Sequence, residues 1–525
     1  MKTPTGTARV MSIAAAVLLL AACGVNPVTG KRELQLVSET EELQMGAQQY
    51  APTRQSEGGD FELLPDLTVY VNEVGQKLAA VSDRKLPYEF KVLNSSVPNA
   101  WALPGGKIAV NRGLLVELKS EAELAAVLGH EIVHAAARHA AKASERGTLL
   151  QAGMAAAQMG AAIGGLDQQM AGLVLGGAGV GAQLVQTRYG RDQELESDLY
   201  GMRYMKAAGY DPRAAVTLQE TFVRLSEGRK ENWLEGMFAS HPPSAERVAR
   251  NRETAQQLGD GGDMGTERYA ARIAPLLKVK PAYDKYDQAL AALQKKDPSS
   301  ARALANDAIR LESREASFHQ LLGDIDLNEK HQREALPHYE RAIALNPGYF
   351  GPWLGAGVAE YRLGDKQKAM TSLTHSWELL PTAPAALFLG NISRDRGDQA
   401  GALKYYQAAA SAQGSVGEQA QREALLLDLP QNPGKYVAAG LGAGASGEHL
   451  VVVQNRSPVA LSNIQVTPVL VNANGQIVQQ GKAVNIRGPV QSGGQVTTEA
   501  AGLSSLTAEQ LQAVRFRVDA ARIAE

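Results

Sequence analysis

The chain has 525 residues, which is too long for one ordinary domain and predicts two to four domains. It carries 53 lysines and arginines against 55 aspartates and glutamates, so the formal net charge is −2. This balance excludes the strongly basic surface that is typical of nucleic-acid binding, and a hydrophobic content of 44% is normal for a globular protein.

Residues 1–22 have the pattern of an export signal peptide. A short basic segment precedes Ser12–Leu20, an apolar run too short to span a bilayer as a stable helix. The run ends in Leu20-Ala-Ala-Cys23, which resembles the lipobox of bacterial lipoproteins. The resemblance implies that Cys23, the only cysteine, is acylated and anchors the protein in a membrane. Gly24 follows Cys23, which resembles the pattern for sorting to the outer membrane, so we expect the protein on the periplasmic side of that membrane. The alternative to a lipoprotein signal is a plain secretory signal.

Four elements are predicted between residues 38 and 110. Ser38 is a suitable N-cap for a helix that starts at Glu39. Leu67 to Val81 indicates an amphipathic helix. Tyr88–Leu93 alternates like a strand, and Lys107–Val110 is a second short strand after a Pro-Gly-Gly turn.

The strongest predicted helix runs from Glu121 to about Ser144 and is rich in alanine. His130 and His134 are four residues apart, so a helix places both imidazoles on one face, where they can bind one Zn²⁺. Glu131 could then hold the metal-bound water and take its proton. His139 is rotated off this face, and we expect it at the helix surface or behind a ligand.

A helix that simply exposes these polar residues to solvent is the alternative. Apolar residues at 125–128 and 132–133 argue against it, because they indicate a buried helix. Buried polar groups need partners, and a metal ion would supply one.

A zinc hydrolase needs a third protein ligand and an open position on the metal. Glu194 and Asp198 are four residues apart on a second predicted helix, Arg188 to Ala208. One carboxylate could bind the metal, and the other could accept the free N–H of a ligating histidine. Between the two helices, residues 152–184 are mostly apolar and rich in glycine. A membrane span, contact with a membrane surface and packing around a cleft are all open for this segment, and we favour packing.

A period of 33 to 34 residues follows a boundary that we predict near Lys278–Tyr283. Small residues, large apolar residues and glycines recur at these intervals: Ala335, Ala369 and Ala402; Tyr339, Leu373 and Tyr406; Gly323, Gly357 and Gly390. The period resembles tetratricopeptide (TPR) repeats over residues 281–415, an α-solenoid that normally binds peptides or proteins. From His449 the pattern changes to period two, and residues 440–525 predict a small β-sandwich of Ig-like type.

His-Glu-Ile-Val-His, followed some sixty residues later by Glu194-Leu-Glu-Ser-Asp198, resembles the HtpX/BepA group of gluzincin zinc metallopeptidases, metallopeptidase family forty-eight. The resemblance implies a mostly helical, zincin-type metallopeptidase domain with a small β-sheet over residues 23–275. It assigns the third ligand to Glu194 rather than Glu196, and the supporting acid to Asp198. Asn26–Lys31, Asn99–Val110 and Ser240–Arg247 resemble other segments of the family.

Two further site residues come from the resemblance. The resemblance implies that His241 lies on a loop that can approach the zinc and hold the site closed; a loop histidine that only packs is the alternative. Arg247 is a candidate for stabilising the oxyanion. The segment Asn99–Val110 corresponds to an edge strand along which a substrate would extend.

The sequence thus predicts a zinc-dependent endopeptidase of the bacterial cell envelope, with one Zn²⁺ per chain and a zinc-bound water activated by Glu131. By resemblance, the substrates are misassembled outer-membrane proteins, and the repeats recruit them or the outer-membrane assembly machinery, which would make the role protein quality control. The main alternative is a catalytically silent or self-locked lipoprotein that acts as a chaperone or assembly scaffold. An adhesion protein is a third class, but it leaves the metal residues unexplained.

Overall fold

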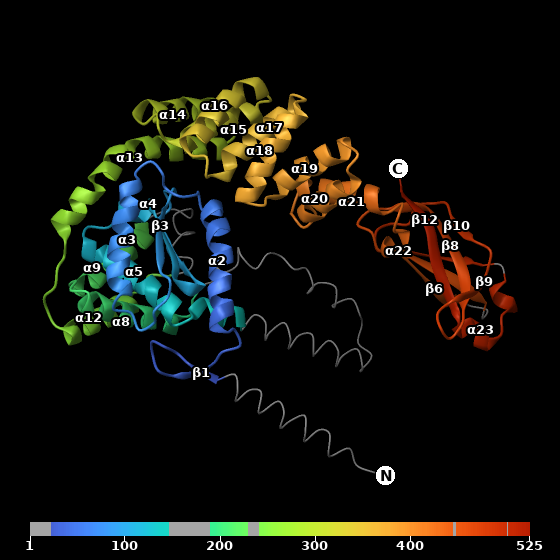
Figure 1. Cartoon of the computed structure of the whole chain (residues 1–525), viewed down its shortest axis with the longest axis horizontal. Coiled ribbons are helices and arrows are strands. Elements are labelled where there is room, and N and C mark those ends of the chain that lie inside the picture. The colour runs from blue at the N-terminus through green and yellow to red at the C-terminus, as the bar shows by residue number, and fades with distance from the viewer. Residues whose placement is uncertain (1–22, 146–188, 229–240, 445–447, 501, 525) are drawn as a thin grey trace, which may run out of the picture. The chain divides into compact units, whose positions relative to one another are not determined.

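A computed structural model of the chain describes residues 23–145, 189–228, 241–444, 448–500 and 502–524 (Figure 1). The predicted signal peptide and the apolar segment 152–184 lie outside these residues. The chain forms two compact units, residues 1–359 and 360–525, and each is described by itself. The fold is mostly helical with small sheets, as predicted.

The first unit begins with a short antiparallel hairpin of β1 (Cys23–Val25) and β2 (Arg32–Leu34). Helix α2 (Glu39–Ser56) starts at the predicted cap, because the Ser38 side chain accepts from the backbone N–H of Glu41 and the Glu41 carboxylate accepts from that of Ser38. Helix α3 (Pro65–Ala79) confirms the predicted amphipathic helix.

A three-stranded sheet lies beside these helices, in the order β3 (Glu89–Leu93), β5 (Lys107–Asn111), β4 (Ala100–Leu103). Strand β5 pairs parallel with β3 and antiparallel with β4. Two of the strands were predicted. The third, β4, was predicted only as part of an edge segment, because its four residues are all buried and show no alternation. The expectation of one edge strand over Asn99–Val110 is wrong: β4 is at the edge, and β5 is central.

The helical core of the first unit surrounds α5 (Glu121–Ala136), whose residues are all buried. The prediction of one helix to about Ser144 is wrong, because the helix ends at Ala136 and Arg138 has a left-handed φ of 63° before helical residues resume at 139–145. Four further helices surround the core or precede it: α4 (Arg112–Leu115), α8 (Arg191–Ala207), α9 (Arg213–Gly228) and α12 (Ala245–Leu258).

Helices α5 and α8 cross at two glycines. A methyl group at Gly201 would lie 3.0 Å from the backbone N of His130 and 3.1 Å from the carbonyl carbon of Gly129. A methyl group at Gly129 would lie 3.1 Å from the carbonyl oxygen of Gly201. Glycine at both positions therefore lets the two backbones approach closely beside His130.

Helix α13 (Thr266–Gln294) runs without a break through residues 278–283, where a boundary was expected. It ties the first repeat to the sheet region. The Arg112 guanidinium lies 3.4 Å from the centre of the Tyr283 ring, and the Ser96 hydroxyl donates to Asp287 at 2.9 Å. The repeats of this unit continue with α14 (Pro298–Leu311), α15 (Ala316–Asn328), α16 (Gln332–Leu345) and α17 (Phe350–Arg362).

The repeat period has a clear packing cause. The recurring alanines are fully buried, and in each of two repeats a tyrosine ring fills the space that a glycine leaves. A methyl group at Gly323 would lie 2.8 Å from the Tyr339 ring, and one at Gly390 would lie 2.6 Å from the Tyr406 ring.

The helices of the second unit are α18 (Lys366–Leu379), α19 (Ala383–Asp395), α20 (Gln399–Ala409), α21 (Ser415–Asp428) and α22 (Pro433–Tyr436).

Two small antiparallel sheets end the second unit and share one apolar core. The first sheet has the order β11-β7-β6, and in the second β8 pairs with β10, β12 and β9. A turn at residues 472–475 joins β8 to β9. The strands are β6 (Val437–Ala443), β7 (His449–Asn455), β8 (Leu461–Val471), β9 (Ile477–Gln480), β10 (Val484–Ile486), β11 (Gln495–Glu499) and β12 (Val514–Ile523), with a short helix α23 (Ala508–Gln512).

We predict that Gly201→Val weakens both the fold and the neighbouring site. The isopropyl group would press on the backbone of α5, and overpacking of this kind costs about 1–3 kcal/mol. Chemical denaturation should show a lower free energy of unfolding, and zinc affinity should fall as well. Arg203→Val, on the exposed side of the same helix, is the control and should leave zinc affinity unchanged.

Candidate metal centre

Two histidines of α5 bring their ring nitrogens together, as the four-residue spacing predicts. His134 Nε2 lies 3.0 Å from His130 Nε2. Both residues are buried, at 8% exposure for His130 and 1% for His134. Burial holds the pKa of His134 well below its usual value, so the ring is neutral and able to offer a lone pair.

Glu194 of α8 approaches the same point. Its Oε1 lies 3.4 Å from His134 Nε2, and its Oε2 lies 3.6 Å from His130 Nε2. Burial alone would raise the pKa of Glu194, but His241 and His130 outweigh it and hold the pKa well below its usual value. The carboxylate is therefore charged.

His241 completes a cluster of four. Its Nδ1 lies 3.0 Å from Glu194 Oε1 and 3.3 Å from His130 Nε2. Its Nε2 lies 3.6 Å from Glu131 Oε1 on the neighbouring side. One donor atom from each of four residues lies within 4.8 Å of the others, and the residues are His130, His134, Glu194 and His241.

The donor set fits a zinc ion. Imidazole nitrogens and a carboxylate are the ligands that zinc takes in hydrolases. If His130 and His134 carry their protons on Nδ1, their Nε2 atoms are two hydrogen-bond acceptors that face each other at 3.0 Å. A shared cation would satisfy both lone pairs. Glu131 Oε2 is buried and has no hydrogen-bond partner among the described residues, so it can act on a molecule bound at the cluster.

Asp198 and Arg247 stand behind the cluster. His130 Nδ1 lies 2.9 Å from Asp198 Oδ1, and the contact fixes the proton on Nδ1. Arg247 donates to both oxygens of Asp198, from Nε and Nη2, at 2.7 Å each. Its Nη1 lies 2.9 Å from Glu194 Oε2. The guanidinium thus contacts two carboxylates, so its part in holding a developing oxyanion stays a prediction.

Three further residues lie near His134, and only His139 among them was considered for a place behind a ligand from the sequence. His139 Nδ1 lies 2.9 Å from His134 Nδ1, and His139 Nε2 lies 3.3 Å from Glu196 Oε1. The Tyr189 ring packs against the His134 ring, with centroids 3.9 Å apart. His139 is 1% exposed, so of its two expected places it takes the one behind a ligand rather than the helix surface. The sequence carried no signal for Tyr189.

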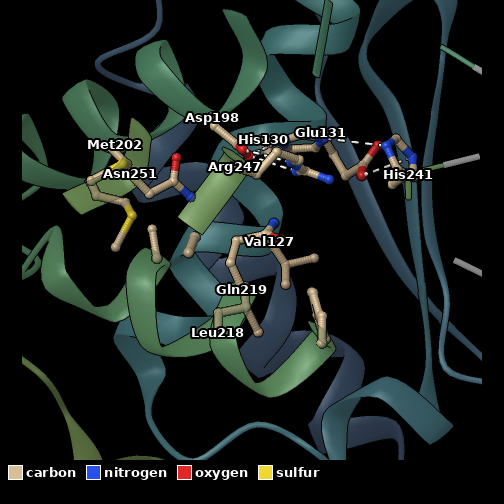
Figure 2. A pocket seen from close by; sticks show the side chains of 14 residues that line it. Val127, His130, Glu131, Asp198, Met202, Leu218, Gln219, His241, Arg247 and Asn251 are labelled. Atoms are coloured by element: carbon tan, nitrogen blue, oxygen red, sulfur yellow. Dashed lines mark hydrogen bonds and ion pairs between the residues drawn. The ribbon is translucent and has the colours of Figure 1, made fainter. Parts of the chain in front are cut away.

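A pocket opens beside Glu131 and Arg247, between α5, α8, α9 and α12 (Figure 2). Its walls are mainly apolar. Two buried carboxamides also line it, and the Oε1 atom of Gln219 has no hydrogen-bond partner among the described residues. The apolar wall is formed by Met202, Met205, Leu218 and Phe222.

The chain is similar in sequence to known proteins. Residues 65–255 match Peptidase family M48, a range that contains the four cluster residues. The Escherichia coli K12 beta-barrel assembly-enhancing protease is 26% identical over 403 residues, which is 69% of this chain and 80% of that protein. The E. coli metalloprotease LoiP is 31% identical over 188 residues, 36% of this chain and 68% of LoiP. A Vibrio cholerae relative of the assembly-enhancing type is 33% identical over 200 residues, which is 37% of this chain; the chain spans only 40% of that relative.

We predict that the full chain, purified without chelator, contains about one zinc per molecule. His134→Ala and Glu194→Ala should each lose it on purification, because each change removes one of the four donors and weakens the hold on the ion. Atomic absorption on folded protein measures this directly. His375→Ala, at a half-buried histidine of the second unit, is the control and should keep full zinc content. A folded wild type free of zinc would contradict the assignment.

Proposed function

Because the chain belongs to peptidase family M48, we propose that it is a zinc endopeptidase of the bacterial cell envelope that cleaves misassembled proteins. The observation that carries the proposal is the buried cluster of His130, His134, Glu194 and His241 next to Glu131. Glu131 Oε2 has no hydrogen-bond partner within the part of the chain that the structure describes. A scaffold without activity would not need a free base at this place.

The chemistry divides between the metal and the chain. Zinc, when bound, acts as a Lewis acid that polarises the peptide carbonyl and makes water a stronger nucleophile near neutral pH. Glu131 then serves as the general base: its Oε2 takes a proton from the attacking water and delivers it to the leaving amine nitrogen. Burial raises the pKa of the Glu131 carboxyl, which makes it a stronger base than an exposed glutamate.

Asp198 and Arg247 keep the ligands in place during this reaction. Asp198 holds the His130 ring through Nδ1, and Arg247 bridges Asp198 and Glu194. A network of fixed charges of this kind does not need to reorganise as charge develops on the substrate. We propose positioning as the main role of Arg247, with oxyanion stabilisation as a second role.

The pocket beside Glu131 suits one side chain of the substrate next to the cleaved bond. Its apolar wall favours an apolar side chain, which would be buried on binding. Such residues are hidden in a folded, assembled protein and exposed in a misfolded one. The enzyme would therefore select chains that have failed to fold.

His241 offers a way to hold this activity back. It is 5% exposed, and its two ring nitrogens face Glu194 and Glu131, so it stands where a substrate carbonyl would have to enter. We propose that the His241 loop closes the site at rest and moves away when a substrate binds. The self-locked state then becomes a regulated form of the enzyme rather than a separate function.

The cellular setting is also a proposal. Relatives of this chain are named for enhancing beta-barrel assembly, and the repeats suit the recruitment of protein partners such as the outer-membrane assembly machinery. Among the described residues, none of the helices combines the length and apolar character needed to cross a bilayer. We propose attachment to the periplasmic side of the outer membrane through lipid on Cys23. The proposed domains are the peptidase at 23–275, repeats at 281–415 and an Ig-like module at 440–525.

We predict that Glu131→Gln lowers kcat/KM for an unfolded protein substrate by at least about 100-fold, because a general base contributes on that scale. The amide keeps the size of the side chain but cannot take the proton. Zinc content and the unfolding temperature should match those of the wild type. Equal cleavage by wild type and variant would remove the enzymatic proposal.

We predict that His241→Ala raises the rate of the same cleavage severalfold, because the entry beside Glu194 is no longer occupied. Initial rates on a fluorescent casein substrate would measure the change. The double variant with Glu131→Gln is the control against a contaminating protease and should be inactive. A lower rate in His241→Ala with full zinc content would show that His241 does not close the site.

A further inference from the structure

The backbone reverses direction just after the metal-binding helix. In an unbroken helix, His139 would lie about 140° around the axis from His134. Instead α5 ends at Ala136, and Arg138 takes a left-handed φ of 63°, which is uncommon for a residue with a side chain. The reversal brings the His139 ring to within 4.9 Å of the His134 ring, centre to centre.

Tertiary contacts hold this reversal. The Arg138 guanidinium is buried, and its Nε donates to Glu42 Oε2 at 2.9 Å. Its Nη2 donates to the carbonyl oxygen of Val37. Glu42 is fully buried and also accepts from both terminal nitrogens of Arg84 at 2.9 Å. A strained turn fixed by a buried ion-pair network indicates that the position of His139 matters to the molecule.

One assignment of protons satisfies every contact on this side of the centre. His134 Nε2 faces the metal cluster, so its proton is on Nδ1. This N–H donates to His139 Nδ1 at 2.9 Å, which must therefore be an acceptor. The proton of His139 is then on Nε2 and points to Glu196 Oε1 at 3.3 Å. The chain of donors ends on a carboxylate, which needs no proton of its own.

We propose that His139 and Glu196 are positioning residues of the metal centre, which fix the tautomer and the ring orientation of His134. They would do for His134 what Asp198 does for His130, through one intervening ring. The contact with a carboxylate makes His134 a stronger electron donor to the metal. From the sequence, His139 was expected at the helix surface or behind a ligand, and Glu196 was given no role. Glu196 stands two residues after the ligand Glu194, which places it about 160° away around the axis of the same helix.

The surroundings of Glu196 support its charge. Its Oε1 lies 3.3 Å from His139 Nε2. Its side chain is 20% exposed, so replacing it does not open a cavity in the core. His139 is buried, so a substitution there is more disruptive to the packing of the core than one at Glu196.

The experiment measures zinc affinity of the full chain by competition with a chromogenic chelator, together with the visible spectrum of the cobalt-substituted protein. His139→Phe keeps a ring of similar size but has no nitrogen. Glu196→Leu removes the acceptor, and Glu196→Gln restores one through its amide oxygen. Asp192→Leu, one turn earlier on the exposed part of α8, is the matched control.

We expect His139→Phe and Glu196→Leu to raise the Kd for zinc by about 10- to 100-fold, as the loss of such partners does in other zinc sites. The cobalt spectrum should shift in both, because the ligand field at His134 changes. Glu196→Gln should return the Kd and the spectrum toward the wild type. Asp192→Leu should change neither.

The inference rests on the proposed metal centre, and its failure can be told apart from the failure of that centre. Wild type that binds no zinc would overturn the centre itself. Wild type that binds zinc, with Asp198→Asn weakened but His139→Phe and Glu196→Leu unchanged, would overturn only the role of His139 and Glu196. If His139→Phe fails to fold, the two Glu196 variants decide the question. Weaker zinc binding in Glu196→Leu that Glu196→Gln does not restore would count against the proposed role of Glu196.

Discussion

The close crossing of α5 and α8 at Gly129 and Gly201 is the constraint on which the rest of the centre depends. Gly201, Asp198 and Glu194 are spaced three and four residues apart, so they lie on one face of α8. Wherever Gly201 touches α5, the two acids must face the same helix. The residue it touches adjoins His130. Two small residues thus place the carboxylates of α8 within reach of the imidazoles of α5, and both sets of ligands lie on helices.

The charged side chains of the centre pair mainly with one another because they are buried. Three carboxylates and three imidazoles stand together in a region almost without solvent, and a buried charge is tolerated only when it is paired. Arg247 pairs with two of the acids, and a divalent cation would balance the remainder. Glu131 is the member left without a firm partner, as expected of the one group that has to exchange a proton.

The sequence allowed the ligands to be predicted because they follow helical periodicity, as His130 with His134 and Glu194 with Asp198 do. The position of His139 does not follow from helical periodicity. Its place depends on a turn at Arg138 that is fixed by Glu42, a contact across 96 residues that local propensity does not contain. Tyr189 and Glu196 are set by the same packing. Strand β4 was missed as a separate element because full burial removes alternation, and α13 runs without a break through residues 278–283, where a boundary was expected.

The hairpin of β1 and β2 bears on how such an enzyme would meet a membrane. The backbone of Cys23 pairs with Leu34, and the N–H groups of Leu36 and Val37 donate to Glu145 at 3.0 and 2.9 Å. A free linker of this length would let the body wander by roughly 20 Å. Here the segment that follows Cys23 is folded and hydrogen-bonded instead. If Cys23 carries lipid as proposed, the zinc would be kept at one height above the bilayer, and the enzyme would cut only those chains that pass through that thin layer.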